Sequence, residues 1–131
     1  MKISPALLAT DVNAYSAQGC ERKRAFHAAG RRFLNELARE LQLPIGSFEV
    51  HSNPAGIAVS GEQTLHGEHL YVQLCESPVC GLGVSALYRS RNGRHDYTGG
   101  ANHFVRMDEL REPGRLQRWL DELRDLNARR G

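Results

Sequence analysis

The stretch that decides the fold is Y-R-S-R-N-G-R-H-D-Y-T-G-G-A-N-H-F-V-R, residues 88–106. Its Asn92-Gly93 dipeptide is the usual centre of a type I′ turn, because both central positions of that turn need a positive φ. Counting outward from the turn predicts a tight hairpin in which Tyr88 faces Tyr97. A hairpin here makes the segments on either side of the turn neighbouring strands of an antiparallel sheet.

Side chains of that hairpin alternate between two faces. One face collects the charged residues Arg89, Arg91, Arg94 and Asp96. The other carries Tyr88 and His95, and it is expected to face the core because Val84 has the same parity as Tyr88. The guanidinium groups are a candidate anion site, since arginine pairs phosphate oxygens bidentately. The alternative is that they are solvated arginines on an edge strand, where charge opposes edge-to-edge pairing.

Two segments have the periodicity of amphipathic helices. The first is residues 16–42, and its apolar stripe is Phe26, Ala29, Phe33, Leu37 and Leu41. Pro44 is expected to end it, and Gly30 to allow a close approach to a sheet. The second starts near Pro113 and runs to about residue 128, with the stripe Leu116, Trp119, Leu120, Leu123 and Leu126.

The segment between these helices reads as a set of strands. They are predicted at residues 45–51, 56–66, 69–75, 84–90 and 94–98. Gly67-Glu68 suits a type II′ turn, which would make His66 and His69 neighbours on the outer face. We therefore predict a single α+β domain over residues 1–131: a long N-terminal helix, an antiparallel meander of about five strands, and a C-terminal helix. Both helices should pack on one sheet face.

Charge is distributed unevenly along the chain. The 131 residues carry a formal net charge of only +2, so the chain as a whole is not an evident polyanion binder. Residues 46–88 hold four Glu and no Lys or Arg, whereas residues 89–106 hold four Arg and one Asp. This asymmetry can support local recognition of an anionic partner. The basic side of the first helix would widen that footprint only if it adjoins the hairpin.

The composition favours a cytoplasmic protein without a membrane partner. No apolar run approaches the ~18 residues of a transmembrane helix. The first residues make a poor signal peptide, because Pro5 and Asp11 break the apolar patch. Three cysteines are an odd number, which argues against a complete disulfide framework and favours reduced thiols.

Metal and thiol chemistry find little support. His66, His69, Cys75 and Cys80 are residue types that bind zinc. A strand over this segment would separate Cys75 from His69 by roughly 20 Å, at ~3.3 Å per residue, so one ion cannot take all four. No metal or cofactor is therefore expected. A Cys-His nucleophile built on any of the cysteines, Cys20 included, lacks any sign of proximity to a histidine.

These observations favour a small recognition or regulatory protein over an enzyme. The expected partner is nucleic acid or an acidic protein surface, bound through the hairpin and the 98–104 loop. The candidate contacts are Arg89, Arg91, Arg94, Asn102 and His103. Tyr71 is expected on the wet sheet face, where it could stack on a base. One alternative is a metal-independent phosphodiesterase or related hydrolase with His95 or His103 as general acid or base. Another is a structural protein–protein interaction module.

Overall fold

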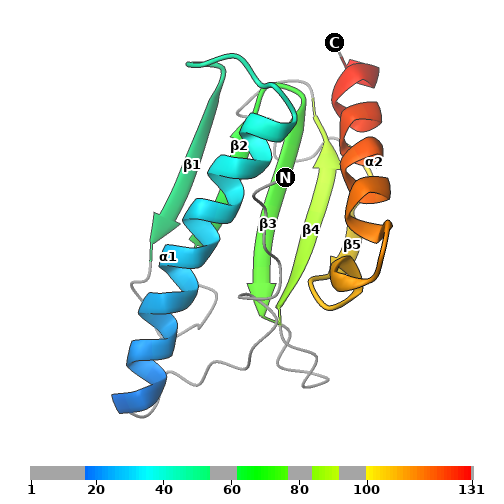
Figure 1. The fold of residues 1–131 in the computed structure, drawn as a ribbon. Helices are drawn as coiled ribbons and strands as arrows, with labels where there is room; N and C mark the ends of the chain where they lie inside the picture. The colour runs from blue at the N-terminus through cyan, green and yellow to red at the C-terminus, as the bar shows by residue number, and fades with distance from the viewer. Residues whose placement is uncertain (1–16, 54–61, 77–83, 92–99, 131) are drawn as a thin grey trace.

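The fold is an antiparallel sheet with helices packed on one face (Figure 1). The computed structural model describes residues 17–53, 62–76, 84–91 and 100–130. Its elements are α1 (Ala17–Glu40), β1 (Phe48–Asn53), β2 (Glu62–Gly67), β3 (Leu70–Glu76), β4 (Val84–Ser90), β5 (His103–Arg106), the short 3-10 helix η2 (Glu109–Arg111) and α2 (Arg115–Arg130). The strands lie in chain order in one sheet of five. The predicted α+β architecture is confirmed in these elements.

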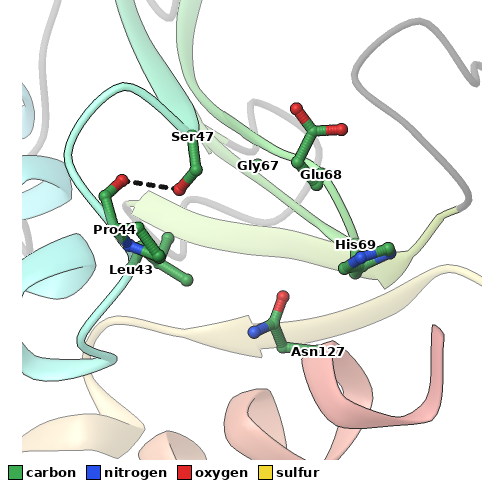
Figure 2. Close-up of a pocket in the computed structure, with 7 residues that line it drawn as sticks. All are labelled: Leu43, Pro44, Ser47, Gly67, Glu68, His69 and Asn127. Carbon is green, nitrogen blue, oxygen red and sulfur yellow. Dashed lines mark hydrogen bonds between the residues drawn. The ribbon is translucent and has the colours of Figure 1, made fainter. Parts of the chain in front are cut away.

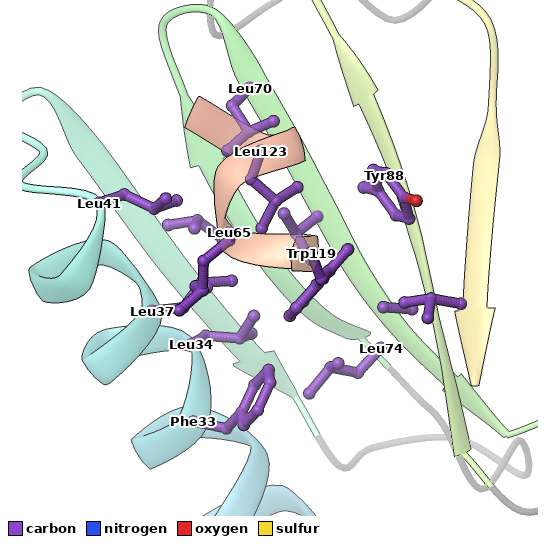
Figure 3. Packing of buried hydrophobic residues seen from close by; sticks show 14 of the residues in the cluster. Phe33, Leu34, Leu37, Leu41, Leu65, Leu70, Leu74, Tyr88, Trp119 and Leu123 are labelled. Carbon is purple, nitrogen blue, oxygen red and sulfur yellow. The ribbon is translucent and has the colours of Figure 1, made fainter. Parts of the chain in front are cut away.

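A single apolar core lies between the sheet and the helices. α1 packs over β1 and β2, while α2 packs over β4 and β3. The two helices meet at Phe33 and Trp119, whose stacked ring centroids are 6.2 Å apart (Figure 3). Trp119 also meets the ring of Tyr88 edge-on at 5.8 Å. The described members of both apolar stripes predicted from helical spacing therefore face the core, as buried Leu37 and Leu123 illustrate.

Gly30 brings α1 close to the sheet. A Cβ atom at this position would overlap the side chain of Gln63, a fully buried residue of β2. Glycine costs helix stability because it loses more backbone freedom than alanine, by roughly 0.5–1 kcal/mol. The close contact with β2 explains why a glycine is accommodated here, and it confirms the expected role of Gly30.

α1 ends in a Schellman motif built without glycine. The amide of Leu43 donates to the carbonyl of Ala38, and that of Gln42 to the carbonyl of Arg39, both at 3.0 Å. Gln42 takes the left-handed conformation of the motif, with φ 57°. Pro44 follows directly, so the helix stops before the proline, as predicted.

The first strand begins later than predicted. Residues 44–47 form a turn in which the amide of Ser47 donates to the carbonyl of Pro44 at 3.0 Å. Gly46 has φ 87°, the positive value that a type II turn needs at its third position. Ile45 is consequently fully exposed at the tip, and β1 starts only at Phe48. The proline and glycine outweigh the β-propensity of Ile45.

The β2–β3 register differs from the predicted one by two residues. Leu65 pairs with Val72 and His66 with Tyr71, so Glu68 and His69 form the turn. The expected neighbours His66 and His69 are therefore not partners. The predicted faces survive, because a shift of two residues keeps the alternation of side chains. The remainder of the predicted second strand, residues 56–61, lies outside the described residues.

The β4 pairing also differs from the predicted hairpin. Tyr88 pairs with His103, and Ala86 with Val105, so Tyr97 is not the partner of Tyr88. β5 brings buried Val105 to the core, whereas the predicted strand 94–98 contains no aliphatic residue to bury. The described register of β4 is thus set by a strand that contributes an aliphatic residue to the core. The predicted strand itself and the Asn92-Gly93 turn lie outside the described residues.

Candidate functional site

The sheet face opposite the helices carries three contacting aromatic rings, which we call the ring row: His51, His66 and Tyr71. The ring centroids of His51 and His66 are 4.5 Å apart, and those of His66 and Tyr71 are 5.3 Å apart. They share this face because each is adjacent in sequence to a core-facing residue, such as Leu65 for His66. Neither α1 nor α2 covers the ring row, since both helices lie on the other side of the sheet.

Polar neighbours orient each member of the ring row. The Oγ1 of Thr64 lies 2.8 Å from Nε2 of His66. The hydroxyl of Tyr71 donates to the side-chain oxygen of Gln73 at 2.9 Å. His51 has its Nε2 3.3 Å from a carboxylate oxygen of Glu49. The ring row is thus held in place rather than projecting as separate flexible side chains.

Two of the predicted site arginines lie against the ring row. The guanidinium carbons of Arg89 and Arg91 are 5.1 Å and 5.5 Å from the centroid of the Tyr71 ring. Such contacts are cation–π interactions, which favour a fixed orientation of the ring. The two arginines share a face, as the alternation predicted. They are nevertheless only 7% and 0% exposed, so the alternative of solvated edge-strand arginines is wrong for this pair. β4 is also an interior strand.

β5 extends the same face beyond β4. Phe104 pairs with Leu87 and is 66% exposed, an unusual exposure for a large apolar ring. Arg106 follows on the same side, and its Nε donates to a carboxylate oxygen of Glu109 at 3.1 Å. We call the ring row together with Phe104 the aromatic face. Alternation along the strands predicts Tyr71 and His66 on this face, but it does not predict the contacts of His66 with His51 and Tyr71 or the position of Phe104, because these depend on the strand register.

The predicted contact His103 lies on the opposite side of the sheet. Its ring stacks on Tyr88 with centroids 5.4 Å apart and an interplanar angle of 23°. Asn102 is exposed just before β5. The sheet therefore separates His103 from Arg89 and Arg91, and the structure does not bring the predicted set together.

The remaining predicted site residues, Arg94 and His95, lie outside the described residues. Their relation to the other candidates stays a prediction. Of the two histidines considered for acid–base chemistry, only His103 has a described position. It faces α2 rather than the buried arginines. No described contact therefore favours the hydrolase alternative.

Tyr88 forms a partly buried hydrogen bond beside His103. Its hydroxyl donates to a carboxylate oxygen of Glu122 in α2 at 3.0 Å. Burial raises the pKa of the Tyr88 hydroxyl well above its ordinary value, and the hydrogen bond and negative charge of Glu122 raise it further. The phenol thus stays protonated and acts as a structural donor that ties α2 to β4.

A zinc site built on His66 and His69 finds no support in the fold. His66 lies in β2 opposite Tyr71, whereas His69 lies in the following turn. Within the described parts of the chain, no cluster of three or more His, Cys, Asp or Glu side chains could hold a metal ion. Cys80, the last member of the predicted set, lies outside the described residues.

His69 instead lines a pocket that the sequence analysis missed. The pocket has a volume of about 210 Å³ and lies between the connection from α1 to β1 and the β2–β3 turn (Figure 2). Asn127 of α2 completes it. No sequence signal links Asn127 to His69, because only the packing of α2 on the sheet brings them together.

Comparisons with known proteins do not indicate a function for this arrangement of residues. The chain matches no family model, no curated protein and no solved structure. Among the described helices, none is long and apolar enough to cross a membrane. The function must therefore be argued from the geometry of the aromatic face and its surroundings.

Proposed function

We propose that this protein is a small binding protein that holds single-stranded nucleic acid on its aromatic face. The observation that carries the proposal is the ring row, together with exposed Phe104 on the same sheet face, which neither helix covers. Stacking on such rings tolerates any sequence, because every base presents a π-face. This retains the expected nucleic-acid partner, but moves the proposed contacts from the arginine hairpin to the aromatic face.

The most accessible members of the face are proposed to make direct contacts. Phe104 is 66% exposed, and the His51 side chain is 44% exposed. They lie on edge strands β5 and β1, at opposite ends of the sheet. Half-buried Tyr71 lies between them on β3. An extended single strand that crosses the sheet could therefore stack successive bases on these three rings.

The arginines are proposed to support binding in two different ways. Arg89 and Arg91 are buried, so they would act by orienting Tyr71 and by adding positive potential to the face. Arg106 has 43% of its side chain exposed and is proposed to meet a phosphate next to Phe104. Asn102, which is exposed, remains a further proposed contact, and so does Arg94, which lies outside the described residues. Because few of these charges are exposed, the salt dependence should be shallow. We also propose a cytoplasmic location, because three cysteines favour reduced thiols over a disulfide framework.

Fluorescence anisotropy of labelled oligouridine and oligothymidine tests the proposal directly. The wild type should bind single strands and bind a duplex of the same length more weakly, since paired bases cannot stack on the rings. Replacing Phe104 or Tyr71 by Ala should weaken binding by roughly tenfold each, because one stacked base contributes ~1–3 kcal/mol. Tyr71→Phe keeps the ring and should bind nearly as well as the wild type.

Matched control variants distinguish the loss of stacking from non-specific losses of binding affinity. Ile45→Ala also removes an exposed apolar side chain, but from a turn far from β5, and should leave binding unchanged. Arg32→Ala removes an exposed positive charge from α1 and should likewise have little effect. Absence of binding at low salt, or equal losses in Ile45→Ala and Phe104→Ala, would count against nucleic acid. An interaction module for protein partners would then be the better explanation of the exposed Phe104.

A further inference from the structure

The pocket beside the β2–β3 turn is a second candidate site, separate from the aromatic face. One wall comes from Leu43 and Pro44, and the other from Gly67 and His69. Figure 2 shows Asn127 projecting from α2 towards the space between these walls. None of these residues belongs to the aromatic face, so the pocket could be occupied whether or not nucleic acid is bound.

Two polar groups of the pocket have no partner among the described residues. The Nδ1 atom of His69 is buried and makes no hydrogen bond there. The side-chain amide of Asn127 makes none either in the described part of the chain. A buried polar atom without a partner costs about 1–3 kcal/mol, so a ligand that satisfies it recovers part of that free energy. The pocket is thus polar at one place and apolar along its sides.

The walls of the pocket are held before any ligand arrives. Arg91 donates from its backbone amide to the carbonyl of His69 at 3.0 Å, and from Nε to the carbonyl of Gly67 at 2.9 Å. On the other wall, the hydroxyl of Ser47 donates to the carbonyl of Pro44 at 2.6 Å. A preorganised pocket loses less conformational freedom on binding, which favours the binding of small ligands.

The groups around the pocket favour a hydrogen-bond donor that carries positive charge. A neutral imidazole protonated on Nε2 accepts at Nδ1, and the Asn127 amide offers a second acceptor oxygen. Asn127 lies in the last turn of α2, where helix carbonyls carry partial negative charge. The carboxylate of exposed Glu68 lies at the rim. Among these groups the carboxylate of Glu68 disfavours an anionic ligand.

We propose that this pocket binds a primary amine on a short apolar stem. Because Nδ1 of His69 is buried, its ring would rotate to bring this atom to the pocket. The ammonium group would then donate to Nδ1 of His69 and to Asn127, while the stem contacts Leu43, Pro44 and the backbone of Gly67. A volume of about 210 Å³ is smaller than most drug-sized sites and suits an alkylamine or one lysine side chain. Both sources share the same chemistry.

Three probes with the same branched stem and different head groups test the assignment. Isoamylamine, isoamyl alcohol and isovalerate are titrated into the whole protein while backbone amide chemical shifts are recorded. Isoamylamine should give saturable shifts at Gly67, His69 and Asn127, with affinity in the millimolar range expected for so few atoms. The alcohol should bind several-fold more weakly and isovalerate not at all. Equal shifts with all three probes, or none with isoamylamine, would overturn the proposal.

Variants identify the contacts, and a second amine identifies the source. Asn127→Ala should weaken the binding of isoamylamine at least several-fold. Glu68→Gln should weaken the binding of isoamylamine but not that of isoamyl alcohol. Glu112→Gln removes an exposed carboxylate outside the pocket and is the matched control. Unchanged affinity in both pocket variants would contradict the assignment. If Nα-acetyl-lysine amide binds with the same affinity as isoamylamine, the ligand is the lysine side chain of a partner protein. If it binds more weakly, the ligand is a free amine.

Discussion

The Nε of Arg91 lies 2.9 Å from the carbonyl oxygen of Gly67, so a residue that directly follows β4 fixes the turn between β2 and β3. The backbone amide of Arg91 reinforces this by donating to the carbonyl of His69. The side chain is fully buried, although arginine is usually exposed. Its position makes Arg91 a structural residue first, and a partner contact only indirectly through Tyr71.

Loss of the Arg91 side chain should therefore destabilise the fold. Arg91→Ala leaves the Gly67 carbonyl without its donor and opens a cavity, so we expect the free energy of unfolding to fall by about 2–4 kcal/mol. Arg91→Lys should also destabilise, because an ammonium group cannot reproduce the planar guanidinium geometry. Urea unfolding measures both. Arg32→Ala, on the exposed side of α1, should change stability by less than about 0.5 kcal/mol. Equal stabilities of Arg91→Ala and Arg32→Ala would refute this role.

Two glycines with similar backbone angles should respond very differently to alanine. Gly100 has φ 76° and Gly114 has φ 77°, so alanine is strained at both. A Cβ at Gly100 would overlap the backbone carbonyl of Ser90, whereas a Cβ at Gly114 would meet nothing within 4 Å. Gly114→Ala should cost about 1–2 kcal/mol from left-handed strain alone. Gly100→Ala should cost about 1–3 kcal/mol more, because the clash is with backbone. Thermal or urea unfolding that gives equal losses would argue against the close approach of Gly100 to β4.

Gln42 offers a stabilising substitution. It ends α1 with φ 57°, a conformation that glycine adopts without a Cβ penalty. Gln42→Gly should therefore raise the free energy of unfolding by about 0.5–1 kcal/mol, whereas Gln42→Ala retains the Cβ and should not. Urea unfolding of the three proteins measures the difference. A glycine variant less stable than the alanine variant would contradict a left-handed Gln42.

Tyr88 should make stability fall at high pH. Its hydroxyl pKa is raised in the folded protein by burial and by the hydrogen bond to Glu122, whereas in the unfolded chain it titrates near its ordinary value of about 10. The unfolded state therefore loses this proton first. The contribution of the protonated phenol is complete below about pH 10 and is lost as pH rises towards the raised pKa.

Tyr88→Phe provides the measurement for that dependence. The variant should lose about 1 kcal/mol near neutral pH through the missing hydrogen bond. Its stability should then fall less steeply than that of the wild type as pH rises above about 10, since the unfolded variant has no phenol at this position to ionise. Urea unfolding at several pH values gives both curves. Parallel curves over this range would show that Tyr88 does not contribute to alkaline sensitivity.

The periodicity of the sequence predicts the elements of the fold but not how the strands pair. Apolar spacing predicts both helices and the core-facing side of β3, where Leu70, Val72 and Leu74 are all buried. It also predicts Tyr71 on the opposite face. The turn chemistry of Gly67-Glu68 and of the Asn92-Gly93 dipeptide does not predict the pairing. The β2–β3 register is shifted by two residues, and Tyr88 pairs with His103 instead of Tyr97.

The sequence by itself determined both helices, the approximate places of β1 to β4 and the apolar side of these elements, because periodicity is a local property of the chain. It did not predict β5 (His103–Arg106). Only the tertiary structure decided the strand registers, the burial of Arg91 against Tyr71, and the pocket that His69 and Asn127 both line. These depend on contacts between segments far apart in sequence. The burial of Val105 and the hydrogen bond that satisfies the Gly67 carbonyl contribute free energy only once the helices and sheet have packed together.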